Sequence, residues 1–454
     1  MKPGWPGRTS DELSDFLRQQ HGAGELESKG FFTIAAEAAI GKLAAFGLPR
    51  ASAWILKIVQ AAVAAGAPHL QIAQHADVTL FEFEPRQPTS GNDLQQWLAS
   101  VQPSPERWLQ HLSAGLRSVG FADQRAFTLS CRSQGVETLI GWDGQELRRR
   151  DRPDPKVGRL LRLGVSFPPD DRGKVFGGAF RSGTRAVEEY QELVNNASAC
   201  PIPCLVDGRR IDTLERRQLQ VIESSRSLLG IGWNSGVEGL HPFGPPQGLP
   251  KAQSSWRPSD RFTDARPLTL VGQPAPAVSL LWRLDYHYRI EGHRSRESDF
   301  RFHSLPQGSR CCWLRDGVAC QVERIEALES SPISLTLYVS ADDLETDISG
   351  FAMRDERALS GRLKRALRAL VPQMAEVEVA LQEHYSLPFG SHVALYGGIG
   401  LAVVAAVPSL GKSMVAALMG AQLLQSAYDK SQIVKACRSA LEGFLVNLDR
   451  VAHR

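Results

Sequence analysis

One stretch of this chain, Glu25–Glu84, constrains the fold most, because it combines two helical patterns with a pair of strand patterns. In the second helical pattern, apolar residues recur at three- and four-residue spacing and predict one buried helix face. These residues are Ile55, Leu56, Val59, Ala62 and Val63. Gly66 stands where a C′ glycine is expected to end the helix, and a short strand at Leu70–Ala73 follows. The stretch therefore predicts a helix that leads directly into strands.

The segment Lys57–Ala67 resembles the signature helix of the GHKL ATPases, the superfamily of gyrase, heat-shock chaperone, histidine kinase and mismatch-repair ATPases. In that family the helix reads roughly E-L-x-x-N-S-x-D-A-G-A, and a strand such as I-x-I follows. The sequence K-I-V-Q-A-A-V-A-A-G-A aligns with the helix without a gap. The resemblance implies a two-layer α/β sandwich of the histidine-kinase-like ATPase type at residues 25–147, after an N-terminal extension at residues 1–24.

The family helix supplies two catalytic groups, and this chain has replaced both. The resemblance implies a Glu that activates the attacking water and, four residues later on the same helix face, an Asn that holds Mg²⁺. Lys57 and Ala61 occupy these positions. An ammonium group cannot act as a carboxylate base, and alanine has no oxygen to offer Mg²⁺. We therefore predict a degenerate member, a pseudo-ATPase with no catalytic residue at Lys57 and no metal at Ala61.

Three positions are candidates for contact with ATP or ADP. Gly66 ends the signature helix, and Glu84 follows the next strand, where the family has an Asp-x-Gly turn. Gly115 lies in Ser113–Leu116, in the place of the family's last glycine motif. This segment falls inside a predicted continuous helix, whose N–H groups are used within the helix, so a phosphate cradle is not expected there.

An active ATPase of the same fold is the alternative interpretation. Its base and metal ligand would have to come from elsewhere in the domain. The candidates that we consider are Glu82, Glu84 and Asp93.

The first half of the chain continues with strands and helices. Arg125–Cys131 and Glu137–Trp142 predict a hairpin, and Arg148–Pro155 reads as a charged linker between domains. Residues 156–214 predict an α/β segment that resembles the transducer domain of chaperone and mismatch-repair members. Within it, Asp207-Gly208 is a strong hairpin-turn signal.

The second half predicts further β structure. Residues 215–268, rich in glycine, proline and serine, predict a loop or flexible insertion. Residues 269–386 predict a β-rich α+β domain with strands at Ala277–Ile290 and Ile333–Ser340, an Asp316-Gly317 hairpin turn and a helix at Asp355–Leu370. Leucines form the buried stripe of that helix and Arg362 is placed outside it. Asp285 and His287 face one side of their strand, and we expect them on a solvent face rather than in a metal site.

The apolar segment Val393–Leu424, in a helical C-terminal region at residues 387–454, admits three interpretations. Ala406–Ser413 satisfies the permissive P-loop pattern, but 41 residues after Ser413 are too few for the remaining βα units. The 18 uncharged residues Val393–Leu410 lie at the lower limit for a membrane span. A buried pair of helices is the third interpretation, and we favour it.

Composition limits the possible partners and the compartment. A formal net charge of +3 over 454 residues gives no electrostatic case for nucleic acid. Seven scattered cysteines, together with an N-terminus unlike a signal peptide, favour reduced thiols in a bacterial cytoplasm. We expect the cysteines to be buried small side chains; the alternative, a zinc site built from Cys200, Cys204 and Cys311–Cys320, lacks a common ligand spacing.

Taken together, the sequence predicts a cytoplasmic α+β protein with a degenerate ATPase-like domain, transducer-like and β-rich middle segments and a helical C-terminus. The predicted function is a pseudo-ATPase that serves as a chaperone-like or regulatory scaffold for protein partners. A homodimer and a membrane-associated effector acting through residues 393–424 remain open. No motif identifies a substrate or pathway.

Overall fold

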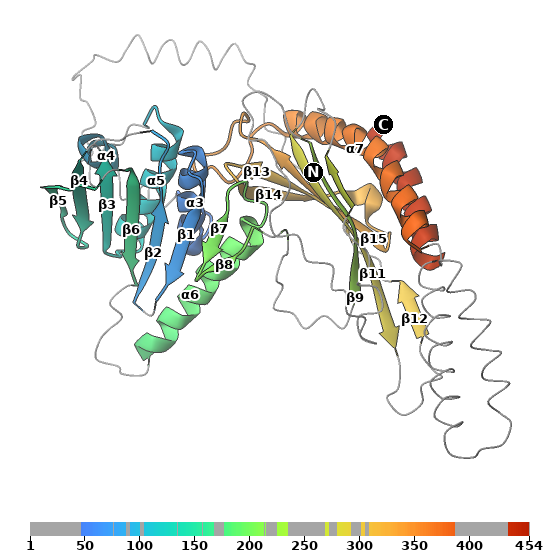
Figure 1. The fold of residues 1–454 in the computed structure, drawn as a ribbon, viewed down its shortest axis with the longest axis horizontal. Coiled ribbons are helices and arrows are strands. Elements are labelled where there is room, and N and C mark those ends of the chain that lie inside the picture. The colour runs from blue at the N-terminus through green and yellow to red at the C-terminus, as the bar shows by residue number, and fades with distance from the viewer. Residues whose placement is uncertain are drawn as a thin grey trace, which may run out of the picture. The chain divides into compact units, whose positions relative to one another are not determined.

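The protein has an α+β fold with two mixed sheets (Figure 1). The computed structural model describes residues 47–75, 77–87, 91–99, 104–133, 135–156, 158–167, 177–212, 214, 225–234, 268–271, 279–291, 301–304, 308–385 and 435–453. Both sheets belong to one compact unit, Ile40–Arg454. The N-terminal extension, the first helical pattern and the apolar segment at 393–424 lie outside the described residues.

The first sheet has eight strands in the order β5-β4-β3-β6-β2-β1-β7-β8. The strands are β1 (Leu70–Gln74), β2 (Val78–Phe83), β3 (Phe127–Ser133), β4 (Val136–Trp142), β5 (Leu147–Pro153), β6 (Leu160–Ser166), β7 (Cys204–Val206) and β8 (Arg209–Arg210). Its helices are η1 (Ala51–Ala53), α3 (Trp54–Ala64), α4 (Gly91–Ala99), α5 (Arg107–Arg117), η2 (Ser118–Ala122) and α6 (Gly177–Asn196). The predicted signature helix, the strand pair after it and the hairpin at β3–β4 are all present.

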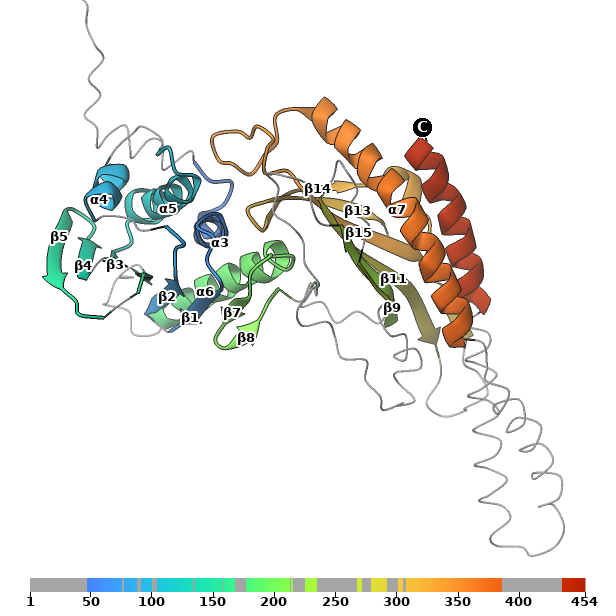
Figure 2. The same cartoon turned by 45° about the horizontal axis from the view of Figure 1, so that its top comes forward.

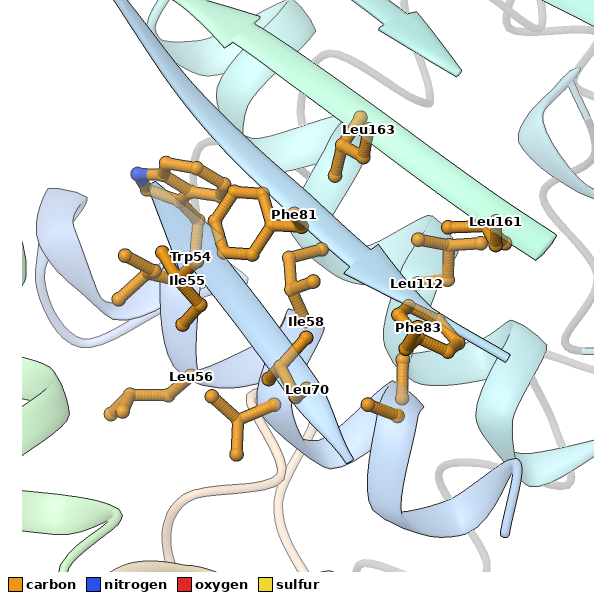
Figure 3. Packing of buried hydrophobic residues seen from close by; sticks show 14 of the residues in the cluster. Trp54, Ile55, Leu56, Ile58, Leu70, Phe81, Phe83, Leu112, Leu161 and Leu163 are labelled. Carbon is orange, nitrogen blue, oxygen red and sulfur yellow. The ribbon is translucent and has the colours of Figure 1, made fainter. Parts of the chain in front are cut away.

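Alternation along the strands decides which face of this sheet is covered. Phe81, Phe83, Leu161 and Leu163 are buried, while their neighbours in the strands point to the other side. Figure 3 shows these side chains packed against residues of α3 and α5, with the ring of Trp54 edge-on to Phe81 at a centroid distance of 5.5 Å. Each such buried side chain contributes roughly 1.5–3 kcal/mol. The opposite side, which we call the open face, lacks this helix layer among the described residues.

Gly66 ends α3 as the sequence predicts. Its φ is +67°. The Gly66 N–H donates to the carbonyl of Val63 at 3.0 Å, and the Ala67 N–H donates to that of Ala62 at 3.1 Å. These two bonds form a Schellman motif, in which glycine adopts the left-handed conformation without a Cβ penalty.

The linker predicted at Arg148–Pro155 is instead an edge strand, β5. Its residues pair in antiparallel register with β4, and Arg152 lies 2.5 Å from Glu137 across the pair. Charged side chains are typical of exposed sheet edges, because they oppose pairing with another chain. The predicted boundary between residues 147 and 156 therefore does not separate two sheets, since β6, β7 and β8 complete the first one.

The second sheet has seven strands, in the order β10-β9-β11-β15-β13-β14 with β12 paired to β11. These are β9 (Ser225–Asn234), β10 (Leu268–Val271), β11 (Leu280–Glu291), β12 (Arg301–Ser304), β13 (Arg310–Arg315), β14 (Val318–Arg324) and β15 (Ile333–Ser340). The short helix η3 (Glu326–Leu328) follows β14, and α7 (Glu356–Tyr385) follows β15. Figures 1 and 2 show α7 beside the helix at residues 435–453, and Arg368 Nε donates to the carbonyl of Ala452 at 2.7 Å.

Three expectations about the second half were wrong. Residues 215–268 include β9, whose glycines Gly230 and Gly232 admit the ring of Trp282 against the strand. Asp285 is buried rather than on a solvent face, because the Arg283 guanidinium pairs with it at 2.7 Å. Arg362 is buried as well, where it binds both carboxylate oxygens of Asp343 at 2.6 Å.

A buried ion pair ties α6 to the first sheet. Arg125 Nη1 lies 2.7 Å from Glu189 Oε1, and both side chains are almost fully buried. Glu189 also accepts hydrogen bonds from Trp54 Nε1 at 3.0 Å and from Thr79 Oγ1 at 3.2 Å.

We predict that Glu189→Ala lowers the free energy of unfolding by about 3–5 kcal/mol, because it leaves Arg125 as an uncompensated buried charge. Urea denaturation measures the effect. Glu188→Ala, at the neighbouring exposed position, is the control and is expected to change stability by less than about 0.5 kcal/mol. Equal effects of the two substitutions would contradict the prediction.

Candidate functional site

Lys57 and Ala61, which the resemblance aligns with a catalytic base and a metal ligand, are both buried. Lys57 is 3% exposed, and Ala61 is fully buried. Gln60, which lies between these two residues in the sequence, is also fully buried. Its Nε2 donates to the carbonyl of Arg315 at 3.1 Å. The face of α3 that carries Lys57 and Gln60 is therefore covered by protein, in part by the hairpin β13–β14.

The Asp316–Gly317 turn of that hairpin docks into a polar socket. We define the socket by Val63 of α3, Arg107 and His111 of α5, and Cys200–Pro201 after α6. A Cβ on Gly317 would lie 2.6 Å from Pro201 Cδ and 3.1 Å from Val63 Cγ2, so glycine permits the close approach. Asp316 and Gly317 have φ values of +46° and +76°, as a two-residue type I′ hairpin turn requires.

The carboxylate of Asp316 anchors the turn in the socket. Its Oδ2 lies 2.7 Å from His111 Nε2 and 2.7 Å from Arg107 Nε. Arg107 Nη2 also lies 3.1 Å from Asp342 Oδ1, and the backbone N–H of Asp316 donates to the same oxygen at 2.6 Å. Ser340 Oγ donates to Asp342 Oδ2 at 2.7 Å. Two carboxylates of the second half are thus held by one arginine and one histidine of α5.

Burial controls the ionisation of the two bases in this region. Burial lowers the pKa of His111 to about 4, and the hydrogen bond to Asp316 opposes this shift. His111 is therefore neutral at pH 7 and donates Nε2–H to Asp316. Burial likewise lowers the pKa of Lys57 to about 8, against the attraction of Asp316 and Asp347. The Lys57 ammonium lies 4.2 Å from the centroid of the Phe351 ring, a cation–π contact.

The three predicted nucleotide-contact positions lie in or directly after three different elements. Gly66 caps α3 beside the side chain of Arg86, and Glu84 is exposed after β2. Gly115 lies inside the continuous helix α5, as predicted. A Cβ on Gly115 would lie 3.1 Å from Ile58 Cδ1 and 3.1 Å from Lys57 Cβ, so this glycine lets α5 pack closely on α3.

The carboxylates of the alternative interpretation lie apart from Lys57. Glu82 is on the open face of the first sheet, where its Oε2 lies 2.6 Å from Arg162 Nε. Asp93 is exposed in the first turn of α4. The structure brings neither of them to the face of α3 that carries position 57.

The open face contains a hollow of about 700 Å³. Leu80 is 41% exposed there, and the Glu82–Arg162 ion pair lies in its lining. Further lining residues come from β1, β3 and the β7–β8 turn: Gln71, Ala73, Thr128, Ser130, Asp207 and Gly208. This surface combines an exposed apolar side chain with charged and amide groups, a composition suited to contact with another protein.

Among the residues described, no group of three or more histidine, cysteine or acidic side chains is placed to hold a metal ion. Six of the cysteines are buried and Cys320 is half-buried, in agreement with the expectation that they pack as small side chains. Burial raises the pKa of the Cys200 thiol to about 12. No helix in the described part of the chain is long and apolar enough to cross a membrane. The P-loop pattern and the predicted apolar helices at 393–424 lie outside that part.

No protein-family model matches the chain, and a comparison with curated proteins also finds no match. A comparison with solved structures finds the B subunit of DNA gyrase from Myxococcus xanthus, with 9% sequence identity and a TM-score of 0.39. The match covers 72% of this chain and 89% of the gyrase chain.

The socket has no signal in the sequence. Asp316-Gly317 predicts a turn, but a turn signal does not indicate what the turn packs against. His111 and Arg107 lie on a predicted helix about 200 residues away in the chain. Nothing local to any of these residues distinguishes a buried histidine from an exposed one.

We predict that Lys57→Met raises the free energy of unfolding at pH 7. The pKa shift from 10.5 to about 8 means that the folded protein disfavours the charged lysine, a cost of about 3 kcal/mol. Because the folded-state pKa is the lower one, wild-type stability should rise between pH 8 and 10.5, and the variant should lose this rise. Urea denaturation across this range tests both statements.

Lys364→Met, at an exposed position on α7, is the matched control for the loss of one lysine. It should leave both the stability at pH 7 and the alkaline slope unchanged. A Lys57→Met protein that is less stable than wild type at pH 7 would show that the ammonium contributes more through its contacts than its burial costs.

Proposed function

We propose that this protein is a non-hydrolysing, degenerate GHKL-type protein that acts as a regulatory scaffold for protein partners. The observation that carries the proposal is the state of the α3 face. Lys57 replaces the carboxylate base, Ala61 offers no metal ligand, and both are buried. The order of elements is the order that the resemblance implies: α3, the β1–β2 pair, α5 with its Ala-Gly-Leu, and the β3–β4 hairpin.

The chemistry of the buried face supports the loss of hydrolysis. General base catalysis needs a group that can accept a proton from water within hydrogen-bond reach. Lys57 has a cation–π contact with Phe351 and is only 3% exposed, under residues of the second half of the chain. The carboxylates Glu82, Glu84 and Asp93 lie elsewhere on the domain and do not replace it.

The open face of the first sheet supports the scaffold role. Its hollow presents Leu80 between charged and amide side chains, with the Glu82–Arg162 ion pair in its lining. An exposed apolar side chain beside an ion pair on an uncovered sheet face is a feature of protein-interaction surfaces, which supports a protein partner. We propose a cytoplasmic protein as the partner.

Calorimetric titration of the full-length protein with ATP and ADP, with and without Mg²⁺, tests the proposal together with an assay of phosphate release. We expect no Mg²⁺-dependent turnover. Any nucleotide binding is expected to be weak and independent of Mg²⁺, because no ligand for the ion remains at position 61.

Mg²⁺-dependent phosphate release would overturn the proposal. The triple variant Glu82→Gln, Glu84→Gln, Asp93→Asn then identifies the source of the missing carboxylate. Turnover lost in this variant but kept in Lys57→Met would establish an active enzyme with a relocated base. Turnover kept in both would assign the activity to another part of the chain.

A further inference from the structure

The groups around the Asp316 carboxylate are those of an anion-binding site. A single oxygen, Oδ2, lies 2.7 Å from His111 Nε2 and 2.7 Å from Arg107 Nε. Both donors belong to the first two turns of α5, which begins at Arg107. The amide dipoles at a helix N-terminus add positive potential in this region. The contact of His111 is a charge-assisted hydrogen bond to the carboxylate, whereas Arg107 Nε contributes an ion pair at 2.7 Å without a hydrogen bond.

The carboxylate comes from a part of the chain remote from the groups that bind it. Asp316 is the first residue of a two-residue turn in the second half, 205 residues after His111. The donors are therefore arranged by α5 and the first sheet, whereas the anion is delivered by the hairpin β13–β14. A site and an occupant carried on separate elements can be separated without unfolding either element.

We propose that Arg107 and His111, with Lys57 nearby, form an anion site that Asp316 occupies in cis, and that an external carboxylate or phosphate group competes with Asp316 for it. The inference deepens the proposed function, since it concerns the α3–α5 face that the scaffold proposal describes as closed. It assigns a carboxylate or phosphate group to that face as its ligand, and displacement of Asp316 as the way in which the face opens.

The surrounding charges favour a small anion. Positive groups near the turn are Arg107, Arg315 and the Lys57 ammonium, whose pKa the Asp316 carboxylate raises against the larger effect of burial. The negative groups are Asp342, which takes the Nη2 side of Arg107, Asp343, whose two oxygens are bound by Arg362, and Asp347. Asp347 is engaged by its own loop, where Ser349 Oγ donates to its Oδ1 at 2.7 Å. Loss of Asp316 would remove the hydrogen-bond acceptor of the His111 Nε2–H and the ion-pair partner of Arg107 Nε.

Access to the site depends on withdrawal of the turn. The Asp316 side chain is 2% exposed and His111 is 8% exposed, whereas Arg107 is 35% exposed. An incoming anion would therefore meet Arg107 first. The socket is closely fitted around Gly317, and Val318, the next residue of the hairpin, is fully buried in the core cluster of the first sheet. Withdrawal of the turn would therefore expose a small apolar contact as well as break the polar ones.

The first test is chemical rescue of Asp316→Ala in the full chain. Without the carboxylate, acetate should bind between Arg107 and His111 and raise the melting temperature by about 1–2 °C at a tenfold excess over its Kd. Inorganic phosphate is the second arm: a larger rise with phosphate than with acetate assigns the site to phosphate groups, and the reverse assigns it to carboxylates. Potassium chloride at equal ionic strength is the reference.

Three further proteins control the rescue. Wild type should show no rise, because Asp316 already fills the site. Arg107→Ala combined with Asp316→Ala should lose the rise. Asp207→Ala, in the exposed Asp-Gly turn of β7–β8, should show none, since that carboxylate contacts the backbone N–H of Gln74. Equal responses to acetate and phosphate in all four proteins would overturn the proposal.

Asp316→Asn keeps the shape of the side chain and replaces Asp316→Ala in the rescue experiment if Asp316→Ala does not fold. It removes the charge, so the external anion should now compete successfully and stabilise this variant as well. The absence of any stabilisation over chloride in a folded Asp316→Asn protein would also overturn the proposal. These measurements do not involve nucleotide turnover, so the scaffold proposal and the anion site can fail independently.

A pair of glycine substitutions tests withdrawal of the turn directly. Gly317 and Gly208 are each the second residue of a two-residue Asp-Gly turn, with φ values of +76° and +75°. Alanine is equally strained at both, but at Gly317 its Cβ would also meet Pro201 at 2.6 Å, and at Gly208 it would meet nothing within 4 Å. Hydrogen exchange should quicken in α3 and α5 of Gly317→Ala and stay unchanged in Gly208→Ala. Unchanged exchange in both would show that the turn does not shield these helices.

Discussion

The Asp316 carboxylate in its socket is the contact on which the relation between the two halves of this fold depends. One oxygen receives Arg107 and His111 of α5, and the following Gly317 packs against Val63 and Pro201. Removal of either partner would leave a buried donor or a buried charge unpaired, which costs more than an ordinary surface contact gains. The turn therefore fixes a specific arrangement through its polar contacts, and Val318 beside it adds apolar burial in the core of the first sheet. This is the physical reason that a face which resembles a catalytic one is closed.

Lys57 shows what this closure costs. A buried ammonium with a lowered pKa is unfavourable at neutral pH, and its compensation comes from the Phe351 ring and from carboxylates of the second half. A methionine at this position would fill similar space without that cost. The lysine is thus a local conflict within an otherwise consistent apolar helix, and such conflicts are expected at functional or regulated places. The Asp316 carboxylate attracts the Lys57 ammonium, so the charge that α3 carries is coupled to the docked position of the turn.

Elements whose signal is local were predicted from the sequence. The apolar stripe of α3, its Gly66 cap, the β3–β4 hairpin and both Asp-Gly turns depend on neighbours a few residues away. The strands β5 and β9 were missed, because arginines and glycines do not predict strands and these become strands through cross-strand pairing. The burial of Asp285, Arg362 and His111 could not be predicted for the same reason. The partner of His111 is 205 residues away, and the Arg283 that pairs with Asp285 also donates to the carbonyl of Leu214, 69 residues away.

The buried ion pairs of this fold have two different roles. Arg125–Glu189 joins α6 to its own sheet and Arg283–Asp285 lies within a single strand, so each stabilises an element in place. The Asp316 contact instead joins α5 to a hairpin of the other sheet, and its arginine is partly exposed. The outer part of Arg107 is in contact with solvent, whereas the Asp316 carboxylate is covered while the turn is docked. A buried pair that is accessible at one end, and that joins elements of separate sheets, has the properties of a reversible latch. The conformational state of the α3 face is therefore set by competition for a single anion position.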